Sequence, residues 1–175
     1  MTNKKTVNKY CYFVGAGKAD GNGPMKNLLD GKGANLAEIV GHPKLWLPVP
    51  QGFTISIELC TYFYEHKPNY PPVLKNQVRV ALSNIEKITQ KKLGDSNNPL
   101  LLSVRSGARR SMPGMMNSVL DIGLNYPTIE GLIKQSGDAI FSYDAFRRLV
   151  RMYADVVKGK AIDKDPKNDE ASAKF

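Results

Sequence analysis

The spacing of apolar residues predicts a chain in which short strands alternate with helices. Short apolar, β-branched and aromatic runs predict strands over four stretches, residues 10–14, 53–57, 100–104 and 119–124. Apolar residues three and four positions apart predict a long helix over residues 72–92, which we expect to close at Gly94. The run over residues 100–104 is too short for a helix, so we expect a buried strand there.

Further helical segments complete the pattern. Residues 35–40 and 57–66 favour short helices, and a last helical stripe comprises Phe146, Leu149, Val150, Tyr153 and Val157. The alternation of strands and helices predicts an α/β fold, with α+β as the alternative, built on a short mixed sheet with flanking helices. A chain of 175 residues can bury one real core, so we expect one compact unit.

The two ends differ in composition from the middle. Residues 1–9 form a polar leader, and residues 158–175 mix both charge signs with few apolar residues, which predicts a disordered tail. The folded domain should therefore span residues 10–157. Because no apolar run reaches signal-peptide or bilayer-crossing length, we expect a cytoplasmic protein without membrane contacts.

Charge and cysteine usage narrow the classes of partner and compartment. The formal net charge of +9 favours an anionic partner, such as a nucleotide, a nucleic acid or an acidic membrane surface, and does not choose among them. The cysteines, Cys11 and Cys60, each lie in an apolar and aromatic stretch outside any CxxC pair. We expect two reduced core thiols in a cytosolic protein.

A first candidate site is the segment LLDGKGANLAE at residues 28–38. Glycines on both sides of Lys32 let the backbone approach a ligand closely, and the following helix offers unpaired N–H groups to an anion. Lys32 can add a point charge to a phosphate. The segment is not a Walker loop, because the spaced first glycine and the Ser or Thr after the lysine are absent. Alone, the segment also fits an ordinary turn before a helix.

A second candidate is SVRSGARRSMPGMM at residues 103–116. Arg105 follows the predicted buried strand, where a guanidinium can grip phosphate oxygens in a bidentate way. Arg109 and Arg110 follow, and no acidic residue occurs between Asp95 and Asp121, so these arginines lack local compensation. The glycine-proline loop carries Met112, Met115 and Met116, which fit a flap over a nucleotide or ordinary core filling.

Other chemistries are poorly supported by the sequence. His42 and His66 lie far apart without cysteines or carboxylates at ligand spacing, which disfavours zinc. Gly15-Ala16-Gly17 lacks the third glycine of a dinucleotide fingerprint. The arginine-rich segment has no interleaved aromatic residues, so a nucleic-acid partner is disfavoured.

The motifs LLDGKGANLAE, LPVPQGFTIS and PLLLSVRSGARRSMPGMM, followed by VLDIGLN, resemble the N-terminal part of pyruvate phosphate dikinase in order and spacing. The resemblance runs over residues 10–159. Phosphoenolpyruvate synthase shares the first two motifs, so a synthase-like fragment is an alternative, but SGARRSMPGMM with VLDIGLN resembles the dikinase.

The resemblance implies an incomplete ATP-grasp-type nucleotide-binding domain. In the family, ATP, phosphate and pyruvate give AMP, diphosphate and phosphoenolpyruvate through a phosphohistidine on another domain. Residues matching Lys32 and Arg105 contact the ATP phosphates, and Arg109, Gly114, Met115 and Met116 are expected to lie near the nucleotide. Several features depart from the family. Asp30 replaces a glycine and puts a negative charge beside the expected phosphate site, and Asn117 stands where an aspartate is common. Arg110 stands where a small residue is frequent and can partly offset Asp30, and the segment over residues 42–46 is longer than usual.

The resemblance also implies what the chain does not contain. Magnesium ligands, the phosphohistidine domain and the pyruvate-binding barrel lie in later parts of the family's sequence, so we expect no activity from this chain alone. The leading hypothesis is a dikinase fragment, from a split or decayed gene or a truncated chain, with the remainder of the enzyme as its partner in trans. The alternatives are a stand-alone nucleotide-binding or regulatory module without catalysis and a basic nucleic-acid-binding descendant.

Overall fold

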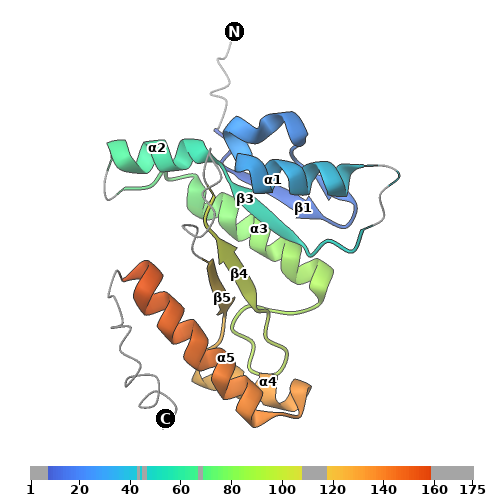
Figure 1. Ribbon diagram of the computed structural model, residues 1–175, viewed down its shortest axis with the longest axis vertical. Helices are drawn as coiled ribbons and strands as arrows, with labels where there is room; N and C mark the ends of the chain where they lie inside the picture. Colours follow the sequence, from blue (N-terminus) through green and yellow to red (C-terminus); the bar gives the residue numbers. More distant parts are fainter. Residues whose placement is uncertain (1–7, 43, 45–46, 67–68, 108–117, 159–175) are drawn as a thin grey trace. The chain divides into compact units, whose positions relative to one another are not determined.

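The chain divides into two compact units in the computed structural model, which describes residues 8–42, 44, 47–66, 69–107 and 118–158 (Figure 1). The first unit comprises Met1–Gln90 and Gly107–Met115, and the second comprises Lys91–Ser106 and Met116–Phe175. Chain length predicts one compact unit, whereas the contacts within the chain separate two. Most of the expected leader and nearly all of the expected tail lie outside the described residues.

The first unit is built on a small antiparallel sheet. Its strands run in the order β2 (Lys18–Ala19), β1 (Cys11–Gly15) and β3 (Gly52–Ile55). Along β1 and β3, Cys11 pairs with Ile55 and Val14 with Gly52. The strands predicted over residues 10–14 and 53–57 are therefore confirmed.

Helices of the first unit pack against this sheet. They are α1 (Lys26–Gly41), preceded by the short 3-10 helix η1 (Gly23–Met25), then α2 (Ile57–Glu65) and α3 (Leu74–Thr89). Both α1 and α3 contact β1 and β3, and Figure 1 draws the strands between these two helices. The buried apolar residues come from β1 and the position before it and from α1, α2 and α3, namely Tyr10, Cys11, Val14, Leu29, Ala34, Ala37, Leu59, Ala81 and Ile85.

The side chain of Gln77 ties α3 to the start of β1. Its Oε1 accepts hydrogen bonds from the backbone N–H of Tyr10 at 2.7 Å and of Cys11 at 3.1 Å. Its Nε2 donates to the carbonyl oxygen of Asn8 at 2.7 Å. Three backbone groups at and just before the start of β1 are thus satisfied by one side chain, which fixes the helix on the strand.

The second unit contains a two-stranded antiparallel sheet and two helices. The strands are β4 (Leu102–Arg105) and β5 (Ser118–Ile122), and the helices are α4 (Tyr126–Ser136) and α5 (Ala139–Met152), which continues into the π-helix η2 (Tyr153–Val157). Its core cluster consists of Val119, Leu124, Ala145 and Leu149.

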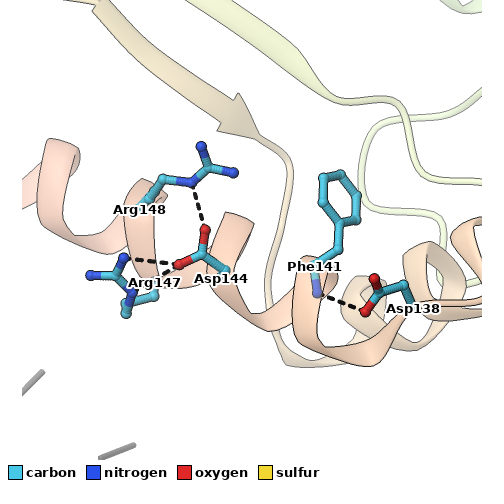
Figure 2. A network of polar contacts seen from close by, with 5 residues as sticks. All are labelled: Asp138, Phe141, Asp144, Arg147 and Arg148. Atoms are coloured by element: carbon cyan, nitrogen blue, oxygen red, sulfur yellow. Dashed lines mark hydrogen bonds and ion pairs between the residues drawn. The ribbon is translucent and has the colours of Figure 1, made fainter. Parts of the chain in front are cut away.

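Two side-chain caps define the starts of α4 and α5. Asn125 and Thr128 form a reciprocal capping box at α4, with distances of 2.8 and 3.0 Å. Asp138 accepts from the backbone N–H of Phe141 at 2.9 Å at the start of α5 (Figure 2). Such caps satisfy backbone donors that the first helical turn leaves unpaired.

Several sequence predictions need correction. The named strands form two small antiparallel sheets and not one short mixed sheet. The strand β4 is not buried: Ser103, Val104 and Arg105 are exposed, and since successive side chains point to opposite faces, residues on both faces of the strand are accessible. The helix α3 closes at Gln90, which has φ 55°, before the predicted stop at Gly94. The residues of the last predicted helical stripe do not form one buried face. Leu149 is buried, whereas Val150, Tyr153 and Val157 are exposed.

The mixture of helices and strands confirms the α/β or α+β class in its coarse form. The helix predicted over residues 35–40 is a part of α1, and the helices predicted over residues 57–66 and 72–92 contain α2 and α3. Within the described stretches, no helix is both long and apolar enough to span a membrane.

Candidate functional site

The helix α1 is interrupted at Asp30, which has φ 60° and ψ 179°. A non-glycine residue rarely adopts these angles, and a helix cannot continue through them. The segment therefore consists of one turn before Asp30 and a helix that starts at Gly31. Asp30 caps that helix, since its Oδ1 accepts a hydrogen bond of 2.8 Å from the backbone N–H of Gly33.

The carboxylate of Asp30 is buried against Gly107. Asp30 is only 8% exposed. A methyl group placed on the Cα of Gly107 would overlap Oδ2 of Asp30 and lie 2.8 Å from its Cγ. Gly107 belongs to the first unit, as Asp30 does. The structure thus brings the two segments selected from the sequence, residues 28–38 and 103–116, into contact at this point.

Gly33 fixes the head of the helix on the sheet. A methyl group on its Cα would lie 2.8 Å from both Cγ2 and Oγ1 of Thr54 in β3. The following residues Ala34 and Ala37 are buried. Close approach of helix and strand therefore depends on the absence of a side chain at Gly33.

The cationic residues predicted for the site lie in different parts of the chain. Lys32 is exposed in the first turn of the helix that Asp30 caps. Arg105 ends β4 in the second unit, where it is exposed and pairs with Ser118 across the sheet. Arg109, Gly114, Met115 and Met116 lie outside the described residues, as do Arg110, Met112 and Asn117.

Comparison with known proteins identifies a homologous group. The chain is 49% identical over 151 residues to pyruvate, phosphate dikinase from Rhizobium meliloti (strain 1021), which covers 86% of this chain and 16% of that protein. It is 47% identical over 138 residues to the dikinase from Clostridium symbiosum, covering 79% of this chain and 15% of that protein. The chain is homologous to a part of pyruvate, phosphate dikinase. No protein-family model matches the chain.

A plant relative extends the comparison. The chain is 46% identical over 154 residues to the chloroplastic pyruvate, phosphate dikinase of Flaveria trinervia, which covers 88% of this chain and 16% of that protein. The chain thus spans about one sixth of the length of these dikinases. The resemblance to pyruvate phosphate dikinase noted from the motifs is confirmed as homology.

Two arginines of α5 in this dikinase-related chain, Arg147 and Arg148, are already paired. Asp144 in α5 accepts from Arg147 Nη2 at 2.8 Å and forms an ion pair with Arg148 Nε at 3.0 Å (Figure 2). These three side chains are about half exposed, so the pairs contribute little to stability. They neutralise part of the positive charge of α5.

The surroundings of Cys11, Cys60 and His66 bear on the thiol and metal chemistry considered from the sequence. Both cysteines are free thiols; Cys11 is buried, and burial raises the pKa of its thiol, which disfavours the reactive thiolate. Cys60 is exposed, so the prediction of a core position is wrong for this residue. His66 stacks on Tyr62 in α2 with ring centroids 4.1 Å apart. Among the described residues, no cluster of three His, Cys, Asp or Glu side chains could hold a metal ion.

The start of the helix at Gly31 is the part of the site whose geometry the structure describes most fully. A helix head, capped by a carboxylate, lies against a glycine of the arginine-rich segment and is fixed on β3 by Gly33. The capping role of Asp30 was not predicted from the sequence, where Asp30 was interpreted only as an added negative charge. The available signal was an aspartate directly before a helical segment, which is a common capping position.

Proposed function

We propose that the chain is an N-terminal, ATP-binding part of a pyruvate, phosphate dikinase, with an ATP-grasp-type architecture. The observation that carries this proposal is the 49% identity to a dikinase over 86% of the chain. The family reaction converts ATP, phosphate and pyruvate to AMP, diphosphate and phosphoenolpyruvate through a phosphohistidine. In this proposal the domain extends over residues 10–157 and contributes the nucleotide-binding step.

The physical support is the meeting of the two candidate segments. Residues around Gly31 and residues around Gly107 were selected independently as phosphate-binding segments, and the Asp30 carboxylate contacts Gly107. A helix head concentrates backbone N–H groups and the positive end of the helix dipole at one place. Lys32 in the first helical turn adds a positive charge beside it.

In this proposal Lys32 and Arg105 position the ATP phosphates. Phosphoryl transfer depends mainly on positioning and on charge stabilisation at the phosphate oxygens, which a lysine and an arginine supply. Arg109, Gly114, Met115 and Met116 complete the nucleotide site from the neighbouring segment. If bound, Mg²⁺ would offset negative charge on the phosphate oxygens. We assign its protein ligands to the remainder of the dikinase.

The proposed partners are the nucleotide and the remainder of the dikinase supplied in trans, in a cytoplasmic setting without membrane or nucleic-acid binding. Since the chain spans about one sixth of its relatives, the proposed complete reaction requires the other domains. The chain alone is expected to bind ATP weakly and to turn over no substrate.

Calorimetric titration with ATP and Mg²⁺ tests the proposal. We expect weak binding by the chain alone, tighter binding once the remainder of a dikinase is added, and loss of binding in Arg105→Ala. Arg79→Ala, which removes an exposed arginine from α3, is the matched control for charge. Binding unchanged in Arg105→Ala would overturn the assignment of that residue.

Three further outcomes separate the alternatives. Saturable ATP binding that the remainder of a dikinase does not change would favour a stand-alone nucleotide-binding module. Absence of ATP binding both alone and with the remainder would overturn the proposed function. A steeply salt-dependent association with mixed-sequence DNA would instead favour a nucleic-acid-binding role.

A further inference from the structure

We propose that Asp30 controls anion access to this site: its carboxylate occupies the position in which a phosphate oxygen would accept the Gly33 N–H, so it competes with phosphate there. This inference rests on the proposed function and concerns the same site. It adds a residue that sets the affinity for phosphate and that acts against binding.

Asp30 occupies a backbone donor at the N-terminus of the helix. Oδ1 of Asp30 accepts from the Gly33 backbone N–H at 2.8 Å. That N–H is one of the donors that a helix start otherwise offers to an anion. A phosphate oxygen and the carboxylate cannot both occupy the same acceptor position, so the side chain must move before an anion can bind to Gly33.

The second carboxylate oxygen of Asp30, Oδ2, makes a contact that does not involve the helix. Oδ2 of Asp30 fills the space next to Gly107, where not even a methyl group could be added without overlap. Asp30 is 8% exposed, and its two carboxylate oxygens face Gly33 and Gly107, one in each of the segments proposed to bind phosphates. The negative charge therefore lies inside the proposed site and not at its edge.

The backbone at Asp30 has a conformation that suits glycine. Its angles, φ 60° and ψ 179°, belong to a region occupied almost entirely by glycine. A glycine can adopt the same backbone without strain and without a carboxylate. Asp30→Gly should therefore keep the course of the chain and leave the Gly33 N–H and the space beside Gly107 accessible to an oxygen of a ligand.

The electrostatic consequence follows from like charge. A phosphate within hydrogen-bond reach of Gly33 would meet the Asp30 carboxylate at close range, and like charges placed together across a binding site disfavour association. Lys32, two residues after Asp30, would offset part of this repulsion. Removal of the Asp30 charge should consequently tighten binding of inorganic tripolyphosphate and ATP by the same mechanism.

The test compares three variants of the full chain. Asp30→Gly removes the carboxylate, Asp30→Asn keeps an acceptor without charge, and Asp155→Asn removes one exposed acidic charge far from Gly33 in sequence. Tripolyphosphate and ATP are titrated calorimetrically, and the Gly33 amide is followed by NMR in the same titrations. We expect at least about tenfold tighter binding in Asp30→Gly, a smaller gain in Asp30→Asn and no gain in Asp155→Asn.

The amide signal distinguishes this mechanism from a change in net charge. In Asp30→Gly the Gly33 amide should shift on addition of tripolyphosphate, whereas in the wild-type chain it should shift little. If Asp30→Gly does not fold, as judged by circular dichroism, the Asp30→Asn comparison decides. Equal ATP affinity of the wild-type chain and the folded Asp30 variants would overturn the inference and leave the proposed function standing. No binding in any variant, even with the remainder of a dikinase added, would overturn both.

Discussion

The carboxylate of Asp30 lies directly against Gly107, and this contact joins two segments far apart in the sequence. Both segments carry dikinase-like motifs, and each is locally ambiguous. Their contact gives a physical reason for a glycine at position 107, since the space that a side chain would need is filled by Oδ2 of Asp30. The contact leads directly to a prediction about stability.

Gly107→Ala should destabilise the chain by about 1–3 kcal/mol, because the added methyl group overlaps a buried carboxylate and forces a shift of chain or side chain. Chemical denaturation measures the change in the free energy of unfolding. The control is Gly31→Ala, where an added methyl group meets no atom within 4 Å. This control should be neutral or stabilising by up to about 1 kcal/mol through higher helix propensity.

The contact between Asp30 and Gly107 also predicts that Asp30→Gly restores part of the stability lost in Gly107→Ala. Combining Gly107→Ala with Asp30→Gly removes the group that the new methyl overlaps, so the double variant should be less destabilised than the sum of the single variants. Coupling energies for residues in contact are about 0.5–3 kcal/mol. Strictly additive effects would show that the two residues do not touch in solution.

Gly33→Ala should also be destabilising, by about 1–3 kcal/mol, because the added methyl group lies 2.8 Å from Cγ2 and Oγ1 of Thr54. Thr54 belongs to β3, so the clash would push the helix away from the sheet. Thermal denaturation followed by circular dichroism measures the effect. Adding Thr54→Ala should restore part of the loss, and a full loss retained in that double variant would contradict the proposed contact.

Gln77→Ala should cost about 1–3 kcal/mol, because the backbone N–H groups of Tyr10 and Cys11 lose their acceptor at a partly buried position. Urea denaturation measures the change. Gln135→Ala is the matched control, since its side chain makes only exposed hydrogen bonds to Asn97 and Asn98, and we expect a change within about 0.5 kcal/mol. Equal effects of the two substitutions would contradict the anchoring role of Gln77.

Much of the fold was predictable because periodicity reports burial directly. The strand β1 and the helices α2 and α3 agree with the patterns from which they were predicted. The helix α4 was not predicted, because its apolar positions are few and Pro127 sits in its first turn. The sequence does hold a signal for it, since Asn125 and Thr128 have the spacing of a capping box and proline is tolerated at the start of a helix.

The candidate site was less predictable, for reasons that concern distance along the chain. Sequence patterns selected residues 28–38 and 103–116 separately, but only the structure places Asp30 beside Gly107. The apolar run before Arg105 suggested a buried strand, whereas Val104 is 56% exposed. A short apolar run indicates a strand and does not report whether a second layer covers it. The backbone angles of Asp30 cannot be derived from a pattern that shows only its charge.

The turn at Asp95 gives the chain a defined dependence on pH. The Asp95 carboxylate accepts backbone N–H hydrogen bonds from Asn97 at 2.7 Å and Asn98 at 3.1 Å, and these bonds lower its pKa, with a smaller contribution from Lys92. The unfolded chain lacks these bonds, so its Asp95 carboxyl has the higher pKa. The charged carboxylate therefore stabilises the fold at pH values above the unfolded-state pKa, and this stabilisation is lost as the pH falls through the folded-state pKa.

Substitution of Asp95 tests this linkage. The difference in unfolding free energy between the wild-type chain and Asp95→Asn should grow in favour of the wild type as the pH rises from acid, and should level off above the unfolded-state pKa of aspartate. Urea denaturation at a series of pH values measures it, and NMR titration of the Asp95 side chain should give a midpoint below that of an aspartate in an unstructured peptide. Asp155→Asn makes the same change in net charge and leaves the Asp95 turn intact. An equal pH dependence in both variants would show that net charge is responsible and that the turn is not.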